Sequence, residues 1–415
     1  MRIGLLSQWY APEPVTIPAV LAGELSRRGH TIRVLTGFPN FPAGRLYEGY
    51  HMAWRQDSEV SGVRIRRTAL LPSHGRSGAG RMVNFGTFAI TSFAFGTKWF
   101  DGIDGLWVYN SPPTVGLPTW FIKFRYRPRV VMHVMDIWPE SLQASGFGGS
   151  AIKLPVVRWG IDKWLSMTYR VADSVACTSR AQIELLTQRG VPRNKLSYVP
   201  IWVDETVFYP LDRDQELAES LGVGGKTVLL YAGAIGEPQG LDVLVEACAR
   251  LKDDPTFHCV VAGSGVAESR LRDRVLLEQI TNISFVGRWP MRDMTRLMSI
   301  GDIHFVGLRA DPLAQLAMPS KLPATLACAK PVIVSARGDA AQVVERAGAG
   351  WTCAPGDARQ LEAAIRSALS ASPATLRMMG HRALQAYQSE FALKSAVDRL
   401  EQLLSGRSLE GAYVA

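Results

Sequence analysis

The feature that most restricts how this chain can fold is a repeated succession of short apolar segments and amphipathic ones. In the first part, the apolar segments end at a polar or turn residue, as buried strands do: "RIGLLS" (2–7), "TIRVLTG" (31–37), "GLWVYN" (105–110), "RVVMHVMD" (129–136) and "SVACTS" (174–179). A second series follows residue 200: "TVLLYAG" (227–233), "FHCVVAG" (257–263), "ISFVG" (283–287), "DIHFVGL" (302–308) and "KPVIVS" (330–335). Such strands alternating with amphipathic helices predict parallel sheets with helices on both faces. We expect an α/β protein with two doubly wound sheets.

The chain length supports a division into two domains, because 415 residues exceed what one ordinary core holds. We expect one Rossmann-like domain over residues 1–200 and a second over 201–385. Residues 386–415 are expected to form a helix that packs back on the first domain, followed by a tail. Two such sheets in tandem would face a cleft lined by the carboxyl ends of their strands.

The charge is unevenly distributed along the chain. Residues 1–200 hold 24 Lys and Arg against 12 Asp and Glu, whereas the remainder holds 22 against 25. A basic first half beside a nearly neutral second half indicates that the halves meet different partners. Nucleic acid, an anionic membrane surface and a phosphorylated acceptor are the candidates for the basic half.

Cysteine spacing and the first residues bear on the compartment. The five cysteines include no CxxC pair, so we expect neither disulfides nor a zinc site. This cysteine usage favours a reducing compartment. The opening "MRIGLLSQWYAPEP" has too short an apolar run for a signal peptide. We expect a cytoplasmic protein.

Residues 82–97, "MVNFGTFAITSFAFGT", form the most apolar window of the chain. The window is shorter than the roughly 20 residues that a spanning helix needs. It fits either a buried core helix or a segment that lies in the membrane interface. The aromatic and basic stretch "WFIKFRYRPR" (120–129) fits the same membrane surface.

Two glycine turns follow adjacent strands of the second half. Gly233 and Gly236 lie in "AGAIGEPQGLD", and Gly263 and Gly265 lie in "VAGSGVAESRL". Glycine lets the backbone approach a ligand closely, and amides at a helix start can face a phosphate. Ordinary strand–helix turns explain many such cases, but two on adjacent strand ends suggest a nucleotide along the edge of the second sheet.

The stretch "PSKL" (319–322) resembles a helix start that binds an anion. With Ser320 as the N-cap, Lys321 is the first helical residue, and Pro323 is tolerated in the first turn. Ser320, free amides and the Lys321 ammonium would then meet at one point, where the helix dipole favours a dianionic phosphate. The alternative is a solvated lysine beside a cap.

Polar residues follow several other strands. In the first half these are Glu13, the pair Asn110 and Ser111, and Asp136, which could orient a sugar hydroxyl or an acceptor or could cap the next turn. In the second half, Arg288 and Arg309 follow strands and are candidates for a diphosphate.

Several chemistries lack their motifs. The chain has no GxSxG, no HExxH, no P-loop lysine motif, no tight His/Cys cluster and no GxGxxG after its first strand. Those absences argue against hydrolases, metal enzymes, kinases and simple dehydrogenases. We expect neither a metal nor a cofactor.

The ordered motifs resemble those of bacterial retaining glycosyltransferases of family 4, which have the GT-B fold. The matching stretches include "YAPEP", "WVYNSPPTVGLP", "MDIWPESL", "YAGAIGEPQGLDVLVEA" and "MPSKLPATLACAKPVI". The chain is most similar to the surface-polysaccharide branch, which includes N-acetylfucosaminyl and colanic-acid transferases. The resemblance implies a nucleotide-diphosphate sugar, with UDP as the expected carrier, on the second domain. It implies a polyprenyl-diphosphate-linked or oligosaccharide acceptor on the first domain, at the inner membrane face, and no nucleic acid.

The chain departs from the wider family at its acidic and basic donor residues. Leu316 and Ala324 stand where the family places two glutamates, and Ala234 and Gln239 stand where it places Arg and Lys. The branch instead has "PSKL" and "GxxQGL". Phosphate neutralisation is therefore assigned mainly to Lys321, and Asp311 is a candidate for the sugar or ribose contact.

The resemblance implies a division of roles between the two domains. Lys321 and Asp136 are the expected catalytic residues. Donor binding is assigned to Ser320, Gly233, Gly236, Gln239, Gly263, Gly265, Arg288 and Arg309, and the acceptor side to Glu13, Asn110 and Ser111. A nucleotide-sugar epimerase on the same fold, or a non-catalytic partner of such enzymes, remains as an alternative.

Overall fold

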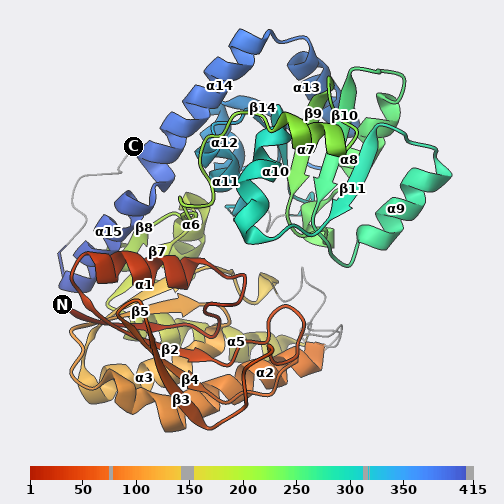
Figure 1. The fold of residues 1–415 in the computed structure, drawn as a ribbon. Helices are drawn as coiled ribbons and strands as arrows, with labels where there is room; N and C mark the ends of the chain where they lie inside the picture. The colour runs from red at the N-terminus through yellow and green to blue at the C-terminus, as the bar shows by residue number, and fades with distance from the viewer. Residues whose placement is uncertain (74–77, 142–153, 312–315, 317, 408–415) are drawn as a thin grey trace. The chain divides into compact units, whose positions relative to one another are not determined.

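The computed structural model describes residues 1–73, 78–141, 154–311, 316 and 318–407 (Figure 1). The chain divides into two compact units, Met1–Pro200 with Lys394–Ala415, and Ile201–Leu393. The sequence places boundaries at 200 and 385, and the structure places the second one after Leu393, so residues 386–393 pack with the second unit. Each unit is described by itself.

The first unit is built on an eight-stranded sheet of order β3-β4-β2-β1-β5-β6-β7-β8. Apart from the β3–β4 pair, every pairing in this sheet is parallel. The central strands are buried along most of their length because their residues are apolar. The strands are β1 (Arg2–Leu6), β2 (Thr31–Gly37), β3 (Arg55–Val60), β4 (Val63–Thr68), β5 (Gly105–Asn110), β6 (Arg129–Val134), β7 (Ser174–Cys177) and β8 (Leu196–Tyr198).

The β3–β4 hairpin and the short strand β8 are the parts of this sheet that the sequence did not predict. The two-residue turn of the hairpin, Ser61 and Gly62, has φ of 51° and 77°, as a tight antiparallel connection requires. Strand β3 is exposed along its whole length. Because its residues are polar and charged, it has no apolar pattern from which a strand could be predicted.

Helices cover both faces of this sheet. They are α1 (Ile17–Arg27), α2 (Gly78–Thr91), α3 (Gly116–Tyr126), α5 (Pro155–Val171), α6 (Arg180–Gln188) and α15 (Leu393–Ser405). A π-helical turn η1 (Ser92–Gly96) and a 3-10 turn η2 (Thr97–Phe100) join α2 to β5. The apolar window 82–97 buries Phe85 and Phe88 but exposes Ile90, so it is core on one side and surface on the other. Within the described residues, no helix is long and apolar enough to span a membrane.

The second unit has a six-stranded, fully parallel sheet of order β11-β10-β9-β12-β13-β14. The strands are β9 (Thr227–Ala232), β10 (Phe257–Ala262), β11 (Ile283–Gly287), β12 (Ile303–Gly307), β13 (Val332–Ser335) and β14 (Gly350–Cys353). The helices are α7 (Gln215–Ser220), α8 (Asp242–Arg250), α9 (Glu268–Leu277), α10 (Met294–Ile300), α11 (Lys321–Ala327), α12 (Asp339–Ala347), α13 (Ala358–Leu369) and α14 (Pro373–Ala386). Tyr231, Phe257 and Phe305 are fully or almost fully buried in its core. The predicted α/β class with two parallel-sheet domains is confirmed.

The helical C-terminal segment is interrupted, and polar contacts explain where it changes unit. A π-helical turn, Tyr387–Phe391, separates α14 from α15. Glu205 accepts hydrogen bonds from the Tyr387 hydroxyl and the Leu393 amide, each 2.9 Å, which holds this turn to the second unit. Residues 408–415 of the expected tail lie outside the described residues.

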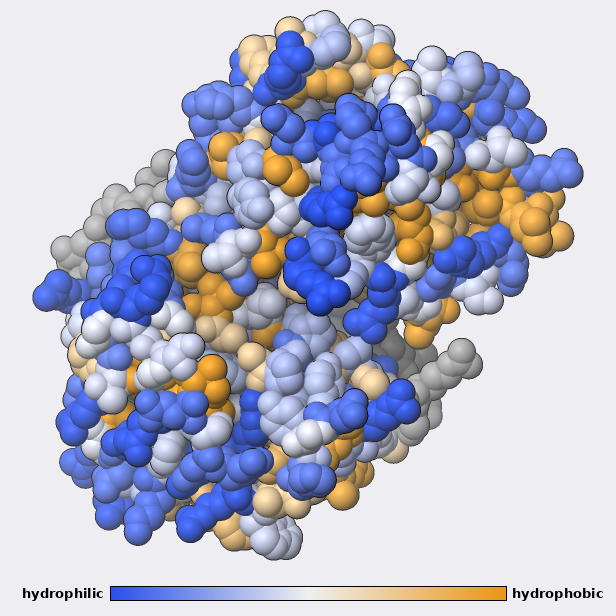
Figure 2. Space-filling model, in the orientation of Figure 1, coloured by the Kyte–Doolittle hydropathy of each residue, from blue (hydrophilic) through white to orange (hydrophobic). Residues whose placement is uncertain are grey.

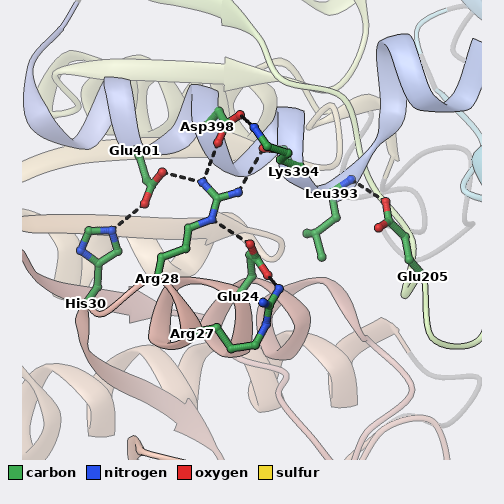
Figure 3. A network of polar contacts seen from close by, with 9 residues as sticks. All are labelled: Glu24, Arg27, Arg28, His30, Glu205, Leu393, Lys394, Asp398 and Glu401. Carbon is green, nitrogen blue, oxygen red and sulfur yellow. Dashed lines mark hydrogen bonds and ion pairs between the residues drawn. The ribbon is translucent and has the colours of Figure 1, made fainter.

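The α15 helix is held to the first unit by ion pairs (Figure 3). Arg28, directly after α1, lies 2.6 Å from both Asp398 and Glu401 and 2.7 Å from Glu24. His30 lies 2.6 Å from Glu401. Because these partners stand on the chain after Leu393, the return to the first unit begins there and not at residue 386.

Candidate functional site

The two glycine turns of the second unit lie side by side at the carboxyl edge of its sheet. The Gly233 amide donates to the Ala262 carbonyl (2.9 Å), and the Gly263 amide donates to the Gly287 carbonyl (2.7 Å). The Ile235 amide donates to the Ser264 carbonyl (2.9 Å), so the turns are bonded to each other. The edge of the sheet is thereby a continuous backbone surface of the kind that can approach a phosphate.

A side chain at Gly233 would collide with the Lys321 side chain, and one at Gly263 would collide with the backbone of Gly233. Gly233 has φ of 150°, and a Cβ there would stand 2.1 Å from Lys321 Cε. Gly263 has φ of 137°, and its Cβ would stand 1.8 Å from the Gly233 carbonyl oxygen. At Gly265, a Cβ would lie 2.2 Å from the Ile235 carbonyl oxygen. The predicted glycine turns are therefore sites of close packing as well as of backbone freedom.

Lys321 is the first residue of α11, as predicted, and its side chain lies against Gly233. Its Nζ is 5.2 Å from the centre of the Tyr231 ring, a cation–π contact. Burial lowers the pKa of Lys321 to about 8, so the ammonium form still prevails at neutral pH. Among the described residues, no carboxylate forms an ion pair with Lys321. A partly buried cation without a partner is suited to bind an anion.

Ser320 occupies the predicted N-cap position of α11, but its side chain makes no capping hydrogen bond. It has helical dihedrals (φ −59°, ψ −19°), and its hydroxyl caps no amide of α11. The Leu322 amide bonds the Pro319 carbonyl instead, at 2.9 Å. Ser320 is exposed, and its predicted contact with the donor stays a prediction.

Gln239 contributes to the turn itself. Its Oε1 accepts from the Gly236 amide at 3.1 Å, which closes the turn before α8. The turn packs on the segment after β12, where the Arg309 amide donates to the Pro238 carbonyl at 2.8 Å. The backbone of the exposed Arg309 therefore lies beside this turn. Arg288 is also exposed but follows β11, at the outer edge of the sheet and two strands from β9.

The positions of the two missing glutamates differ in their surroundings. Ala324 is buried within α11, and Leu316 is partly buried. Asp311 is partly buried, and its amide donates to the Arg309 carbonyl at 2.8 Å. Its predicted contact with sugar or ribose stays a prediction.

The polar residues of the first unit gather at the carboxyl ends of β5 and β6. The Ser111 hydroxyl donates to the Asp136 carboxylate. Desolvation raises the pKa of Asp136, and the hydrogen bond from Ser111 opposes the rise. Residue Asp136 is exposed. Asn110 is buried, and its Oδ1 has no hydrogen-bond donor among the described residues.

Glu13 is buried, and its carboxylate joins the loop at Tyr10 to the loop at Asn40 and Phe41. Its Oε1 accepts from the amides of Asn40 and Phe41, each 2.8 Å, and its Oε2 accepts from the Tyr10 amide at 3.2 Å. Burial raises the pKa of Glu13, while these amides and Arg67 lower it. Its carboxylate is thus occupied within the protein, which favours a positioning role over the predicted acceptor contact.

Two groups at this edge were not found from the sequence. Trp9, Phe41, Phe85 and Trp138 form a chain of ring contacts with centroids 5.7 to 6.4 Å apart. Their spacing in the sequence is irregular, so only the fold brings them together.

The second group is a buried amide network. Asn84 accepts from Gln8 at 2.6 Å and donates to the Leu71 carbonyl at 2.8 Å. It also donates to Asn40 at 3.3 Å. In the sequence, the sign of this buried network was a single Asn within the apolar window 82–97. Among the described residues, no group of three His, Cys, Asp or Glu side chains could hold a metal ion.

Two parallel-sheet units in one chain are the fold of the GT-B class of glycosyltransferases. Solved structures agree in fold. HepE of Anabaena in complex with UDP has a TM-score of 0.72 at 15% identity, over 98% of this chain and 100% of that one. Sucrose-phosphate synthase of Thermosynechococcus elongatus has a TM-score of 0.74 at 18% identity, over 97% and 98%.

Family models match most of the chain. The model described as "Glycosyl transferase 4-like domain" matches residues 15–202, and "Glycosyl transferases group 1" matches residues 212–385. The chain belongs to this glycosyltransferase family and is an enzyme. It is 27% identical to WcaI of Escherichia coli K12, named as a colanic acid biosynthesis glycosyl transferase, over 81% of this chain and 83% of that protein. The predicted resemblance to the surface-polysaccharide branch is confirmed.

Proposed function

We propose that the protein transfers a sugar, with retention of anomeric configuration, from a UDP-sugar to a lipid-linked acceptor. The acceptor is a polyprenyl-diphosphate-linked sugar or a growing polysaccharide, and the product belongs to a bacterial surface polysaccharide. The names of WcaI and of WbjE from Pseudomonas aeruginosa, also named as a glycosyltransferase, support this assignment. The structures of HepE with UDP and with UDP-glucose support UDP as the carrier.

The observation behind this proposal is the Lys321 ammonium held against Gly233 without a carboxylate partner among the described residues. The amides of Gly233, Ile235, Gly236 and Gly263 already donate to acceptors within the turns. The attraction for a diphosphate laid along these turns is therefore assigned to the Lys321 ammonium. Negative charge grows on this diphosphate as it departs, and a fixed cation in a partly buried position stabilises that charge. Lys321 thus supplies the electrostatic help that the family's Arg and Lys supply at other positions.

The transfer breaks the bond between the anomeric carbon and the diphosphate oxygen. A new bond forms between the same carbon and the acceptor hydroxyl oxygen, on the same face of the sugar. The proton of that hydroxyl leaves with the diphosphate oxygen, so the products are the glycosylated acceptor and the nucleoside diphosphate. We assign the orientation of the acceptor hydroxyl to the hydrogen-bonded pair Asp136 and Ser111. No step is assigned to a metal, so transfer should persist in the presence of EDTA.

A panel of nucleotide sugars tests the donor assignment. Each is added to the purified protein with a polyprenyl-diphosphate sugar, and both transfer and thermal stability are measured, because a bound donor stabilises the folded state. Stabilisation by UDP-sugars, with product of retained configuration, is expected. An epimerase would instead change the free nucleotide sugar without any acceptor.

Replacement of Lys321 tests its role. Lys321→Ala and Lys321→Met should lower kcat by about 10²- to 10³-fold with the fold retained. Lys252→Ala removes an exposed lysine of the same unit and serves as the control. Wild-type rates in both Lys321 variants would refute the assignment.

We further propose that the first unit associates peripherally with the inner face of the cell membrane. Exposed apolar side chains stand on neighbouring helices: Ile90 of α2 is 61% exposed, Phe124 of α3 is 87% exposed and Trp159 of α5 is 65% exposed. Phe93 of η1 packs on Phe121 of α3 with ring centres 5.2 Å apart, which joins two of these elements. Figure 2 shows hydrophobic residues interrupting the hydrophilic surface of the molecule. Exposed apolar groups beside basic ones suit a lipid interface.

Vesicle flotation tests this association. Phe124→Ser with Trp159→Ser should weaken binding to vesicles, because both rings are removed from the proposed surface. Leu276→Ser with Leu277→Ser is the control, since these residues of α9 are equally exposed (77% and 83%) but lie in the second unit. Equal binding by both double variants would contradict the proposed surface.

A further inference from the structure

A pocket of the first unit is lined by positively charged side chains that the site described above does not use. It has a volume of about 340 Å³ and is lined by Arg33, Arg55, Arg64, Arg66, Lys98 and Trp99. The residues come from β2, β3, β4 and η2. Five cationic side chains around one cavity repel one another unless an anion lies between them.

The fold fixes these cations around one indole ring. The guanidinium carbons of Arg66, Arg64 and Arg33 lie 4.3, 5.4 and 6.0 Å from the centre of the Trp99 ring. Arg33 and Arg64 are direct neighbours in the parallel register of β2 and β4. Burial lowers the pKa of Arg33, and the nearby Arg64 and Arg2 lower it further. The cluster is therefore held together by the sheet and the ring, at an electrostatic cost.

Carboxylates compensate only part of this charge. Asp57 forms a bidentate pair with Arg66, at 2.7 and 2.6 Å. Arg33 donates to the carbonyls of Trp99 (3.0 Å) and Asp101 (2.9 Å), which are neutral acceptors.

The other three cations make no direct contact of this kind, although the Asp57 charge also acts on Arg55 and Arg64 from a greater distance. Among the described residues, no ion pair joins Arg55, Arg64 or Lys98 to a carboxylate. Glu59 stands opposite Arg64 in the β3–β4 register, yet the two form no ion pair. Three exposed cations thus remain for a ligand.

Exposed aromatic rings adjoin the pocket. Trp54, the residue before Arg55, is 67% exposed and packs on Phe95 with ring centres 5.3 Å apart. Phe95 belongs to η1, which leads directly into the Lys98 and Trp99 of the pocket. An anion with an apolar body fits this combination better than a free ion does, because the rings would cover the apolar part.

We propose that this pocket binds the phosphate headgroup of an anionic membrane lipid, with Arg55, Arg64 and Lys98 as its free cations. The site is separate from the donor edge, which lies in the second unit. It rests on the proposed membrane association and specifies the lipid chemistry that the first unit recognises. Arginine is suited to this role because its planar fork binds phosphate oxygens in pairs.

The test compares the full-length wild type with Arg64→Gln/Lys98→Gln on vesicles of phosphatidylcholine, with and without phosphatidylglycerol. Both residues are exposed, so the fold should be retained, and thermal unfolding checks this. A basic residue near an anionic surface contributes about fivefold to binding, so the double variant should bind phosphatidylglycerol vesicles about 25-fold more weakly. The matched control, Arg45→Gln/Lys252→Gln, removes the same charge from exposed positions outside the pocket and should lose less than about threefold.

Two further arms separate the sources of the phosphate and the two proposed sites. Soluble glycerol phosphate and inorganic pyrophosphate should compete only weakly with the vesicles, and UDP binding should be unchanged in the pocket variant.

Equal losses of vesicle binding in the pocket and control variants would overturn the site. Tight binding of soluble phosphate that depends on Arg64 and Lys98, without dependence of vesicle binding on them, would overturn the lipid assignment. If the wild type transfers no sugar from any nucleotide sugar, while its vesicle binding still depends on Arg64 and Lys98, the proposed enzyme activity is refuted and this site stands.

Discussion

The side chain of Lys321 lies across the backbone of Gly233, so closely that a Cβ at position 233 would stand 2.1 Å from Lys321 Cε. The helix start and the first glycine turn are therefore one structural unit and not two neighbouring motifs. The lysine is held where a diphosphate on the turn would lie, because the missing side chain of residue 233 provides its space. Among the described residues, this cation contacts the Tyr231 ring and forms no ion pair with a carboxylate.

Gly233→Ala should abolish UDP binding. The new Cβ would displace Lys321, and alanine is also strained at φ of 150°. Calorimetric titration with UDP measures the loss. Gly225→Ala is the control, because Gly225 has φ of 72° but no heavy atom within 4 Å of its Cβ position. That variant should lose about 1 kcal/mol of stability and bind UDP normally; UDP binding that survives in Gly233→Ala would contradict the proposed packing.

UDP affinity should fall as the pH rises through about 8. Lys321, with its pKa lowered to about 8, is an ammonium below that pH and neutral above it, so the attraction to a diphosphate is present at the lower pH. A bound anion raises the pKa of Lys321, so the loss of affinity occurs at a higher pH. Titrations from about pH 7 to 9.5 should show this loss in the wild type and not in Lys321→Met, whose affinity is already low. The same slope in both proteins would assign it to another group.

The free energy of unfolding of the protein without ligand should rise with pH, whereas the affinity for UDP falls. The unfolded lysine has a pKa of about 10.4, so between about pH 8 and 10.4 the unfolded chain binds more protons than the folded one. By linkage, the free energy of unfolding contributed by Lys321 then rises with pH. Urea unfolding of the wild type against Lys321→Met across this window measures the difference. A wild-type curve parallel to that of Lys321→Met would show that burial does not lower the pKa.

Asp136→Asn and Ser111→Ala should lower kcat while UDP affinity stays at the wild-type value, because both residues lie in the first unit. The loss is expected to be about 10- to 10³-fold for Asp136→Asn, which loses the charge, and smaller for Ser111→Ala, which loses one hydrogen bond to it. Initial rates and UDP titration of each variant separate the two effects. A change in UDP affinity without a change in kcat would contradict the proposed role of these residues at the acceptor.

Arg28→Ala should destabilise the first unit by about 2 kcal/mol, because it removes the cation that Glu24, Asp398 and Glu401 share, while each of these partly buried carboxylates keeps one other basic neighbour. Figure 3 shows the three carboxylates converging on this guanidinium. Arg27→Ala is the matched control, since Arg27 is 75% exposed and pairs with Glu24 alone. It should cost at most about 1 kcal/mol. Equal effects in thermal unfolding would show that α15 does not depend on Arg28.

The strands and helices of the cores were predictable because buried segments are apolar at regular spacing. The predicted segments 31–37, 105–110 and 283–287 coincide with β2, β5 and β11. Strand β3 was not predictable, since an exposed edge strand needs no apolar residues. Ser320 was assigned as a cap from residue type alone, but its helical dihedrals turn the backbone away from a capping geometry.

The candidate site was predictable only in part, for the same physical reason. Glu13 looked like an acceptor residue because it follows the first strand, whereas the fold surrounds its carboxylate with three amides. The cations around Trp99 were not foreseen, because three strands and a turn are needed to assemble them.

The sequence by itself determined the two parallel sheets, the glycine turns after β9 and β10 of the second sheet, and the helix that begins at Lys321. These follow from local apolar periodicity and from the backbone preferences of glycine and proline, which act between near neighbours. The tertiary structure decided which distant residues meet: Lys321 with Gly233, Ser111 with Asp136, and Arg28 with the last helix. Such contacts depend on the order of strands in a sheet and on how its helices pack, and local periodicity does not specify either one.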